Sequence, residues 1–339
     1  MCKSASSGRF HLPCKKYRGG LIRICAAVSA LAVVSIISFR YISSPHPGGV
    51  FLAPVFSSEE LAQKKAAWDA LERTVAREAA KFKGSIGIVI KDLDTGWTIA
   101  VNQNKLFPSA SLVKIPIMAS YFYAEQENKI ALTQRMVLRN RNKTPGSGTL
   151  KCLPDGTAFQ ISDLIERMIV ESDNTAANML IDRVGFDYLN WSFKRMGLDN
   201  TNLVRKMMDF KKRKKGVENY TTAVDLSKIL EDMYDGRFIG RSVSAQCLGI
   251  LRKQKIRDRI PALLPSYTDV AHKTGLENGV CHDAGIVFTP QGDYLICVLT
   301  RHYNKTARPV KKVISRMALE VYNYKTAGAQ EPLRQAKNF

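Results

Sequence analysis

Apolar residues recur at helical spacing near both ends of the domain and at strand spacing just inside those ends. Residues 61–82 repeat them every three or four positions behind a capping-box pattern of Ser57 and Glu60, which predicts an amphipathic helix. A second helix is predicted from about residue 308 to 324. Two pairs of apolar runs, each joined by a short polar turn, predict two β-hairpins. The four runs are 86–90, 97–101, 285–289 and 294–300.

The middle of the chain, residues 111–264, has a mostly helical pattern. Because the two hairpins come from opposite ends of the domain, one sheet must combine segments that are distant in sequence. We therefore expect an α+β fold, in which helices from both ends cover an antiparallel sheet and a helical subdomain is inserted between them. With 339 residues, 45% of them hydrophobic, the chain can bury a sizeable core.

The N-terminus has the pattern of an export signal. Residues 1–23 carry six basic and no acidic residues, and an apolar run of 16 residues follows at 24–39. No small-residue cleavage site precedes Arg40, which favours a retained anchor in the bacterial cytoplasmic membrane over a cleaved signal and release to the periplasm. The expected segments are a basic head and anchor at 1–44, a Pro- and Gly-rich linker at 45–56, an extracytoplasmic catalytic domain at 57–325 and a polar tail at 326–339.

The net charge of +21 is not by itself a sign of nucleic-acid binding. Seven of the 51 basic residues precede residue 41, and a second cluster lies at 205–215 without any nucleic-acid module motif. We interpret this cluster first as solvated surface and second as a weak attraction to anionic lipid or cell-wall polymer. No nucleic-acid partner is expected, and the protein is expected to be a monomer.

Cysteine and histidine usage gives little support to a metal site. Four of the seven cysteines, Cys152, Cys247, Cys281 and Cys297, fall in the exported part, and we favour free or buried thiols over disulfides for them. The five histidines are scattered, so no metal or cofactor is expected. The string from Cys281 to Asp283 is better explained as the end of a strand than as a nucleophile or metal site.

Ser111 and Lys114 form an S-x-x-K string inside a nearly continuous apolar run. A serine hydroxyl needs a neighbouring base to attack a carbonyl at neutral pH. Residues three apart share one face of a helix, so the Lys114 amine would lie near the Ser111 oxygen. Burial would lower the pKa of the lysine and supply a neutral base.

Two further strings follow in order, Ser172-Asp173-Asn174 and Lys273-Thr274-Gly275. Each is weak alone, but S-x-x-K, S-D-N and K-T-G in this order are the signature of class A β-lactamases and penicillin-binding proteins. The chain resembles this family closely in the spacing of the strings and in their flanks, over about residues 57–325. The resemblance implies the β-lactamase/transpeptidase-like fold, in agreement with the α+β arrangement above.

The resemblance also implies the roles of the residues around the nucleophile. Ser111 would be acylated, and Lys114 would be its base or proton relay. Ser172 would pass a proton to the leaving nitrogen, and Asn174 would orient the substrate and Lys114. Asp173 is expected to hold the loop.

Further roles follow from the resemblance for the third string. Lys273 and Thr274 would bind the substrate carboxylate, and Gly275 would keep the strand edge open to the ligand. The backbone N–H groups of Ser111 and Leu276 would form the oxyanion hole that stabilises the tetrahedral intermediate.

One position departs from the family pattern. Class A enzymes use a loop glutamate for deacylation, and the matching position here falls near Met207. Asp209, two residues away, is the candidate substitute. The alternative is that Asp209 only pairs with Arg205 or with the lysine run.

Three functions remain open on the sequence alone. The first, which we favour, is a serine β-lactamase-like hydrolase acting on β-lactams. The second is a D,D-peptidase acting on acyl-D-Ala-D-Ala stems of peptidoglycan, and the third is a slowly deacylating β-lactam sensor. All three share the fold and the nucleophile, so the fold does not distinguish them.

Overall fold

A computed structural model describes residues 57–335, whose centre is a five-stranded antiparallel sheet with the strand order β2-β1-β9-β8-β7. The strands are β1 Gly84–Asp92, β2 Thr98–Val101, β7 Asp269–Glu277, β8 Val280–Phe288 and β9 Tyr294–His302. Strands β1 and β9 pair along their whole length, from Gly84 opposite His302 to Asp92 opposite Tyr294. The sheet thus combines the two ends of the domain, as the sequence predicted.

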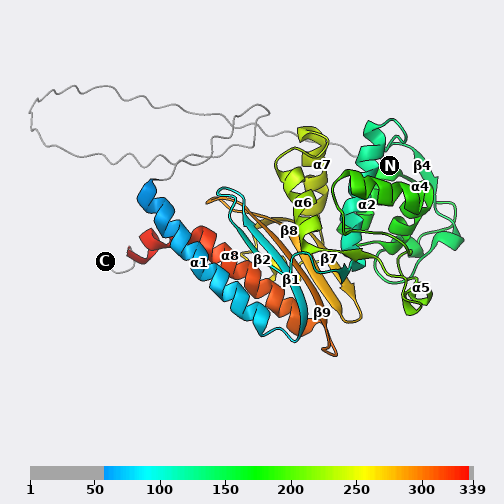
Figure 1. The fold of residues 1–339 in the computed structure, drawn as a ribbon. Coiled ribbons are helices and arrows are strands. Elements are labelled where there is room, and N and C mark those ends of the chain that lie inside the picture. The colour runs from blue at the N-terminus through cyan, green and yellow to red at the C-terminus, as the bar shows by residue number, and fades with distance from the viewer. Residues whose placement is uncertain (1–56, 336–339) are drawn as a thin grey trace, which may run out of the picture. The chain divides into compact units, whose positions relative to one another are not determined.

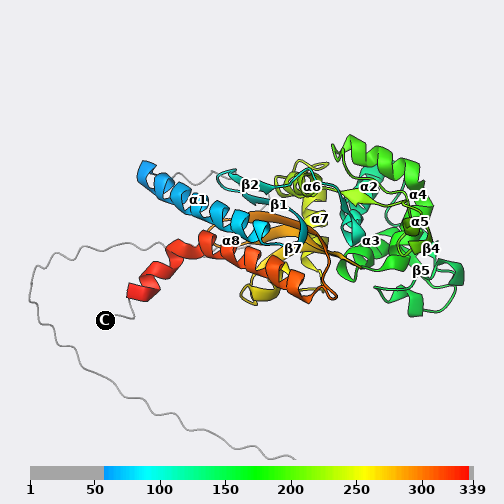
Figure 2. The same ribbon diagram turned by 60° about the horizontal axis from the view of Figure 1, so that its bottom comes forward.

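Two long helices cover one face of this sheet. They are α1, Ser58–Ala80, and α8, Arg308–Gln335, which lie side by side along the strands (Figures 1 and 2). The capping box that begins α1 is present, because Ser57 Oγ accepts from the Glu60 N–H and the Glu60 carboxylate accepts from the Ser57 N–H. The apolar side chains of both helices pack with one side of the sheet.

Helix α8 is longer than the sequence indicated. It continues past residue 324 to Gln335, so the predicted start of a polar tail at 326 lies inside the helix. Just past residue 324, the buried Lys325 amine pairs with Asp92 at 3.0 Å and with Asp94 at 2.7 Å. Lys325 is therefore an internal contact to the end of β1 and to the turn that follows it.

The opposite face of the sheet carries the inserted helical part (Figure 1). Its helices are α2 Lys114–Gln126, α3 Ile161–Val170, α4 Asn174–Arg195, α5 Phe210–Lys214, α6 Ala223–Tyr234 and α7 Arg241–Arg252. Short 3₁₀ turns occur at η1 Ala110–Val113, η2 Asn140–Asn142, η3 Leu150–Cys152 and η4 Ile260–Leu263. Two small ribbons pair β3 Phe107–Pro108 with β6 Tyr220–Thr221, and β4 Arg135–Val137 with β5 Ala158–Gln160.

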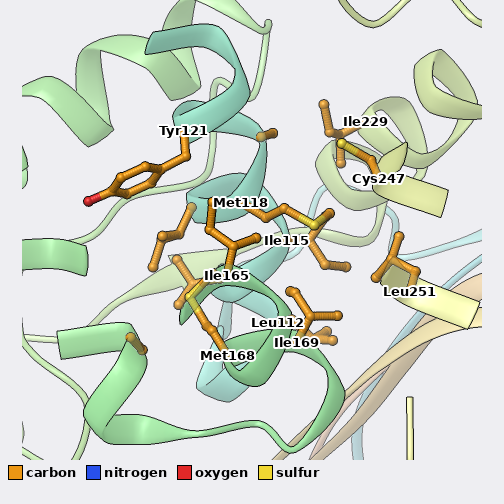
Figure 3. Close-up of a cluster of buried hydrophobic side chains, with 14 of the residues drawn as sticks. Leu112, Ile115, Met118, Tyr121, Ile165, Met168, Ile169, Ile229, Cys247 and Leu251 are labelled. Atoms are coloured by element: carbon orange, nitrogen blue, oxygen red, sulfur yellow. The ribbon is translucent and has the colours of Figure 1, made fainter. Parts of the chain in front are cut away.

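Helix α2 runs through the middle of the helical part. Ile115, Met118 and Tyr121 point from it in different directions into side chains of the surrounding helices, including Ile165 and Cys247 (Figure 3). A helix that is apolar all round is stable only when it is buried all round. This burial makes α2 a rigid support for the residues at its N-terminal end.

Other expectations have mixed outcomes. The four cysteines of the domain are free, and Cys247, Cys281 and Cys297 are buried, which confirms the prediction.

The head, anchor and linker predicted for 1–56 lie outside the described residues. Within residues 57–335, no helix is long and apolar enough to cross a membrane.

Candidate active site

The candidate nucleophile Ser111 lies in the 3₁₀ turn η1, and α2 begins three residues later at Lys114. Residues three apart eclipse one another in a 3₁₀ turn, so both side chains occupy the same face. Ser111 is partly exposed, whereas Lys114 is fully buried. The residue before the nucleophile, Ala110, has a φ of 45°. Such strain in a non-glycine residue is typical of functional turns.

The Lys114 amine is held by the second string rather than by solvent. It donates to Ser172 O at 2.7 Å, to Asn174 Oδ1 at 2.8 Å and to Ser172 Oγ at 3.3 Å. Burial lowers the pKa of the Lys114 amine to about 7, and the Asp173 and Glu277 carboxylates limit the fall. A lysine with this pKa is partly neutral near pH 7 and can accept a proton.

The second string lies in the turn between α3 and α4. Ser172 has a φ of 55° and is nearly buried, so the turn points its hydroxyl inward. Asp173 fixes this turn, as predicted: one carboxylate oxygen caps α4 at the Ala176 N–H, and the other accepts from the Leu150 N–H at 2.9 Å. Asn174 is anchored from its other side by a 3.1 Å bond to Pro145 O.

The third string lies on β7, an edge strand of the sheet. Lys273 is fully buried and donates to Ser172 Oγ at 3.0 Å and to Thr274 O at 2.8 Å. Burial and the nearby Lys114 charge hold the pKa of Lys273 well below its usual range, while Asp283 opposes this. Thr274 is nearly buried beside it.

Gly275 and Leu276 continue the strand past the nucleophile. A Cβ at Gly275 would meet Leu112 Cγ at 3.3 Å and His282 Cδ2 at 3.2 Å. The glycine thus lets β7 approach the η1 turn closely, in addition to leaving the edge open. The Leu276 side chain is 50% exposed, which keeps it outside the core.

The three strings therefore converge on one group of atoms. Lys114 is a buried amine of lowered pKa, and Ser172 is a hydroxyl shared by two lysines. Ser111 is a partly exposed hydroxyl three residues before Lys114 in the adjoining turn. These groups are of the kinds that acyl transfer would need as nucleophile, base and relay. Among residues 57–335, no group of histidines, cysteines and carboxylates could hold a metal ion.

The segment after Arg205 carries the position of the missing glutamate. The amide of Asn178 holds Met207 from both sides, donating to Met207 O at 3.1 Å and accepting from the Met207 N–H at 2.8 Å. Gly146 lies between Asn174 and the next residue, Met208. A Cβ added at Gly146 would lie 2.8 Å from Asn174 Nδ2 and 3.2 Å from Met208 Sδ. The Met208 thioether, which cannot act as a base, is therefore close to Asn174.

Asp209 begins helix α5. Its carboxylate accepts from the Lys212 N–H at 3.1 Å, which makes it an N-cap residue. The structure shows this capping contact, and a role for Asp209 in deacylation stays a prediction.

Sequence reasoning missed a ring of four charged residues beside the cluster, which we call the charge ring. It consists of Arg205, Arg213, Glu218 and Glu277. The alternative that Asp209 pairs with Arg205 is wrong for this arginine, because its guanidinium pairs with Glu218 and Glu277. Three of the four residues lie within the stretch 205–218, and only Glu277 comes from a distant segment, the end of β7.

His282 and its neighbours have the structural role that the sequence favoured. His282 is buried, accepts from the Thr300 N–H and donates from Nε2 to Pro108 O at 2.8 Å. Burial lowers its pKa to about 4, so the ring is neutral. This bond fixes β3, the short strand that leads into η1, to β8 of the sheet.

Comparison with known proteins agrees with this geometry. The family model described as the Beta-lactamase enzyme family matches residues 70–325. This chain belongs to the Beta-lactamase enzyme family. Its fold and the resemblance of its three strings are thereby confirmed, and the chain is a serine hydrolase of this family.

Individual relatives cover most of the domain. β-Lactamase VEB-1 of Pseudomonas aeruginosa is 24% identical over 256 residues, which are 70% of this chain and 85% of the relative. The β-lactamase of Sphaerobacter thermophilus superposes with a TM-score of 0.70 at 32% identity, covering 77% of this chain and 97% of the other. An acyl-enzyme complex of a PBP-A mutant with penicillin G gives a TM-score of 0.68 at 29% identity, covering 76% and 96%.

Proposed function

We propose that the protein is a serine β-lactamase-like hydrolase that opens β-lactam rings through an acyl-enzyme on Ser111. The observation that carries the proposal is the junction at Ser172, where the amines of Lys114 and Lys273 meet one hydroxyl oxygen. Curated relatives named β-lactamases support the substrate class.

In the proposed reaction, neutral Lys114 takes the Ser111 proton as the oxygen attacks the β-lactam carbonyl. The N–H groups of Ser111 and Leu276 stabilise the oxyanion. The Ser172 hydroxyl passes a proton from the lysine side to the leaving nitrogen, so that the ring opens. Asn174 orients the acyl amide and the Lys114 amine.

The substrate carboxylate binds beside Lys273 and Thr274. A carboxylate arriving beside the buried Lys273 amine would favour its charged form, and the pair would then be strong because little water competes with it. The same residues would bind the terminal carboxylate of an acyl-D-Ala-D-Ala peptide, so either substrate fits this end of the site.

One observation favours a second candidate, a penicillin-binding D,D-peptidase or a slowly deacylating β-lactam sensor. The position matching the family's deacylating glutamate falls near Met207, which cannot act as a base, and the carboxylate of Asp209 caps the start of α5. A structural relative is an acyl-enzyme complex of a PBP-A mutant with penicillin G.

Rapid mixing of the full chain with a chromogenic β-lactam separates these candidates. The β-lactamase proposal predicts a burst of one equivalent followed by steady turnover. A burst without turnover would make the protein a penicillin-binding protein. The absence of any burst, with no turnover, would overturn acyl transfer altogether.

We also propose that the enzyme acts outside the bacterial cytoplasmic membrane. The support is the basic head followed by the apolar run at 24–39. Retention as an anchor remains the favoured form, and release into the periplasm is the alternative.

A further inference from the structure

The charge ring joins two arginines and two glutamates in alternation. Arg205 Nη2 lies 2.7 Å from Glu218 and 3.2 Å from Glu277. Arg213 Nε lies 3.0 Å from Glu218, and its Nη1 lies 2.7 Å from Glu277. The side chains are between 1% and 25% exposed, and Arg213 is the most exposed of them. The ring is neutral as a whole, so removing one member would leave a net charge in a region that water screens poorly.

Glu277 lies on the face of β7 that is turned toward the nucleophile turn. Successive side chains of a strand point to opposite faces, so Lys273, Gly275 and Glu277 share one face. The regular pairing of β7 with β8 continues through Glu277, so this alternation is not interrupted. On the same face, the Lys273 amine donates to the hydroxyl that Lys114 also meets, and a Cβ at Gly275 would lie 3.3 Å from Leu112 of η1. The Glu277 carboxylate is therefore on the side of β7 where Lys114 is buried.

The ring also adjoins η1 from the other side. Asn219, the residue after Glu218, accepts from the Arg205 N–H at 2.9 Å and donates from Nδ2 to Arg205 O at 2.9 Å. The backbone carbonyl of Asn219 accepts from the Ser109 N–H at 2.8 Å. Ser109 directly precedes η1, the turn that carries Ser111. Hydrogen bonds thus fix the ring to the nucleophile turn as well as to the end of β7.

The position of the ring lets its charges act on the buried base. Burial lowers the pKa of the Lys114 amine to about 7, and the carboxylates of Asp173 and Glu277 oppose this fall. Lys273 meets Lys114 at a shared hydroxyl, and His282 on β8 is neutral. The charged side chains of α3, α4 and α7, the helices that pack against α2, are partly or fully exposed. Glu277 is thus the member of the ring that faces the base.

We infer that the charge ring sets how readily Lys114 takes the proton of Ser111, and that Glu277 is the positioning residue through which the ring acts. The inference rests on the proposed function. An unbalanced carboxylate at this place would raise the pKa of Lys114 and keep its amine protonated at neutral pH. The two arginines hold Glu277 in ion pairs and so limit this effect, which keeps Lys114 available as a base.

Charge changes of opposite sign within the ring test this inference. The measurement is the acylation rate constant of the full chain with a chromogenic β-lactam between pH 5 and 9, and the compared quantity is the pH of half-maximal rate. Glu277→Gln removes a negative charge, Arg213→Gln removes a positive one, and Glu277→Asp keeps the charge on a shorter side chain. Glu231→Gln is the matched control, because it removes a carboxylate from a partly buried pair with Lys91 outside the ring. Circular dichroism checks that each variant is folded.

The two charge variants should move the pH of half-maximal rate in opposite directions. Glu277→Gln should lower it by about half a unit, because the Lys114 amine loses a carboxylate that favours its protonated form. Arg213→Gln should raise it by about the same amount, because Glu277 loses one of its two partners. Glu277→Asp and Glu231→Gln should keep the wild-type value, even where the maximal rate falls. A ring with a structural role alone would change the rate without these opposed shifts.

The outcomes separate this inference from the proposed function. Unchanged values in both charge variants, shifts of the same sign, or an equal shift in Glu231→Gln would overturn the inference while leaving the proposed function in place. If Glu277→Gln does not fold, the direction of the shift in Arg213→Gln decides alone. A wild type that no β-lactam acylates would refute the proposed function, and the inference with it.

Discussion

Lys114 and Lys273 donate to the same atom, the hydroxyl oxygen of Ser172, at 3.3 and 3.0 Å. Two buried amines this close disfavour each other's charge, and burial lowers the pKa of both. A substrate carboxylate arriving at Lys273 would favour the charged form there, which leaves Lys114 as the neutral member. We therefore expect the pair to divide into a base and a cation when substrate binds.

The pH dependence of acylation follows from the lowered pKa of Lys114. Below about pH 7 the amine is protonated and cannot accept the Ser111 proton, so the acylation rate should fall as the pH falls through 7. The check is the acylation rate constant with a chromogenic β-lactam between pH 5 and 9. A flat profile below pH 7 would show that Lys114 is not the base.

Removal of the amine tests the same role independently. Lys114→Ala should slow acylation by about 10² to 10⁴, the usual contribution of a general base. Because the variant also empties a buried site, its melting temperature is measured beside the rate. A folded variant that is acylated at the wild-type rate would contradict the assignment.

Asp209→Asn separates the two roles of that carboxylate. Asn caps a helix as well as Asp does, so α5 should keep its start. If Asp209 activates the deacylating water, the variant should be acylated normally and release the acyl group about 10² times more slowly. Mass spectrometry would then show the acyl-enzyme accumulating. Equal accumulation by wild type and variant would leave Asp209 with the capping role alone.

Two glycine substitutions test whether close packing against Asp173 supports the turn at Ser172. Gly148 has a φ of +99°, and a Cβ there would lie 2.1 Å from Asp173 Oδ2. Gly148→Ala should therefore lower the free energy of unfolding by about 2 kcal/mol or more and slow acylation as well. Gly156, with a φ of +85° and nothing within 4 Å of its Cβ position, is the matched control, and Gly156→Ala should cost only about 1 kcal/mol. Thermal unfolding of both variants provides the comparison, and equal losses would argue against the clash.

The proposed membrane topology can be tested in spheroplasts. Protease added from outside should digest the catalytic domain and leave the short basic head protected. A domain that becomes sensitive only after lysis would place it on the cytoplasmic side.

The three strings could be found in the sequence because each is short and contiguous, and the structure brings Lys114, Ser172, Asn174 and Lys273 into one hydrogen-bonded group. The catalytic and binding roles of the site residues stay predictions. The charge ring was not predictable, because Arg205 and Glu277 meet only after the sheet has formed, 72 residues apart. The buried pair of Lys325 with Asp92 was missed for the same reason, since it joins positions 233 residues apart.

The turn that contains Ser111 also differs from the helical turn that the sequence predicted. A first helical turn was expected around Ser111, and the structure has a 3₁₀ turn there, with α2 beginning at Lys114. The close approach of β7 at Gly275 and the bond between His282 and Pro108 O fix this turn from the sheet side. Such restraints depend on tertiary packing and have no signature in the local sequence.

The central claim, covalent catalysis by Ser111, is tested most directly by intact-protein and peptide mass spectrometry after incubation of the full chain with benzylpenicillin. The account predicts one adduct per molecule, located on the peptide that contains Ser111 and absent from Ser111→Ala. An adduct that persists undiminished in Ser111→Ala, or that maps to another residue, would contradict it.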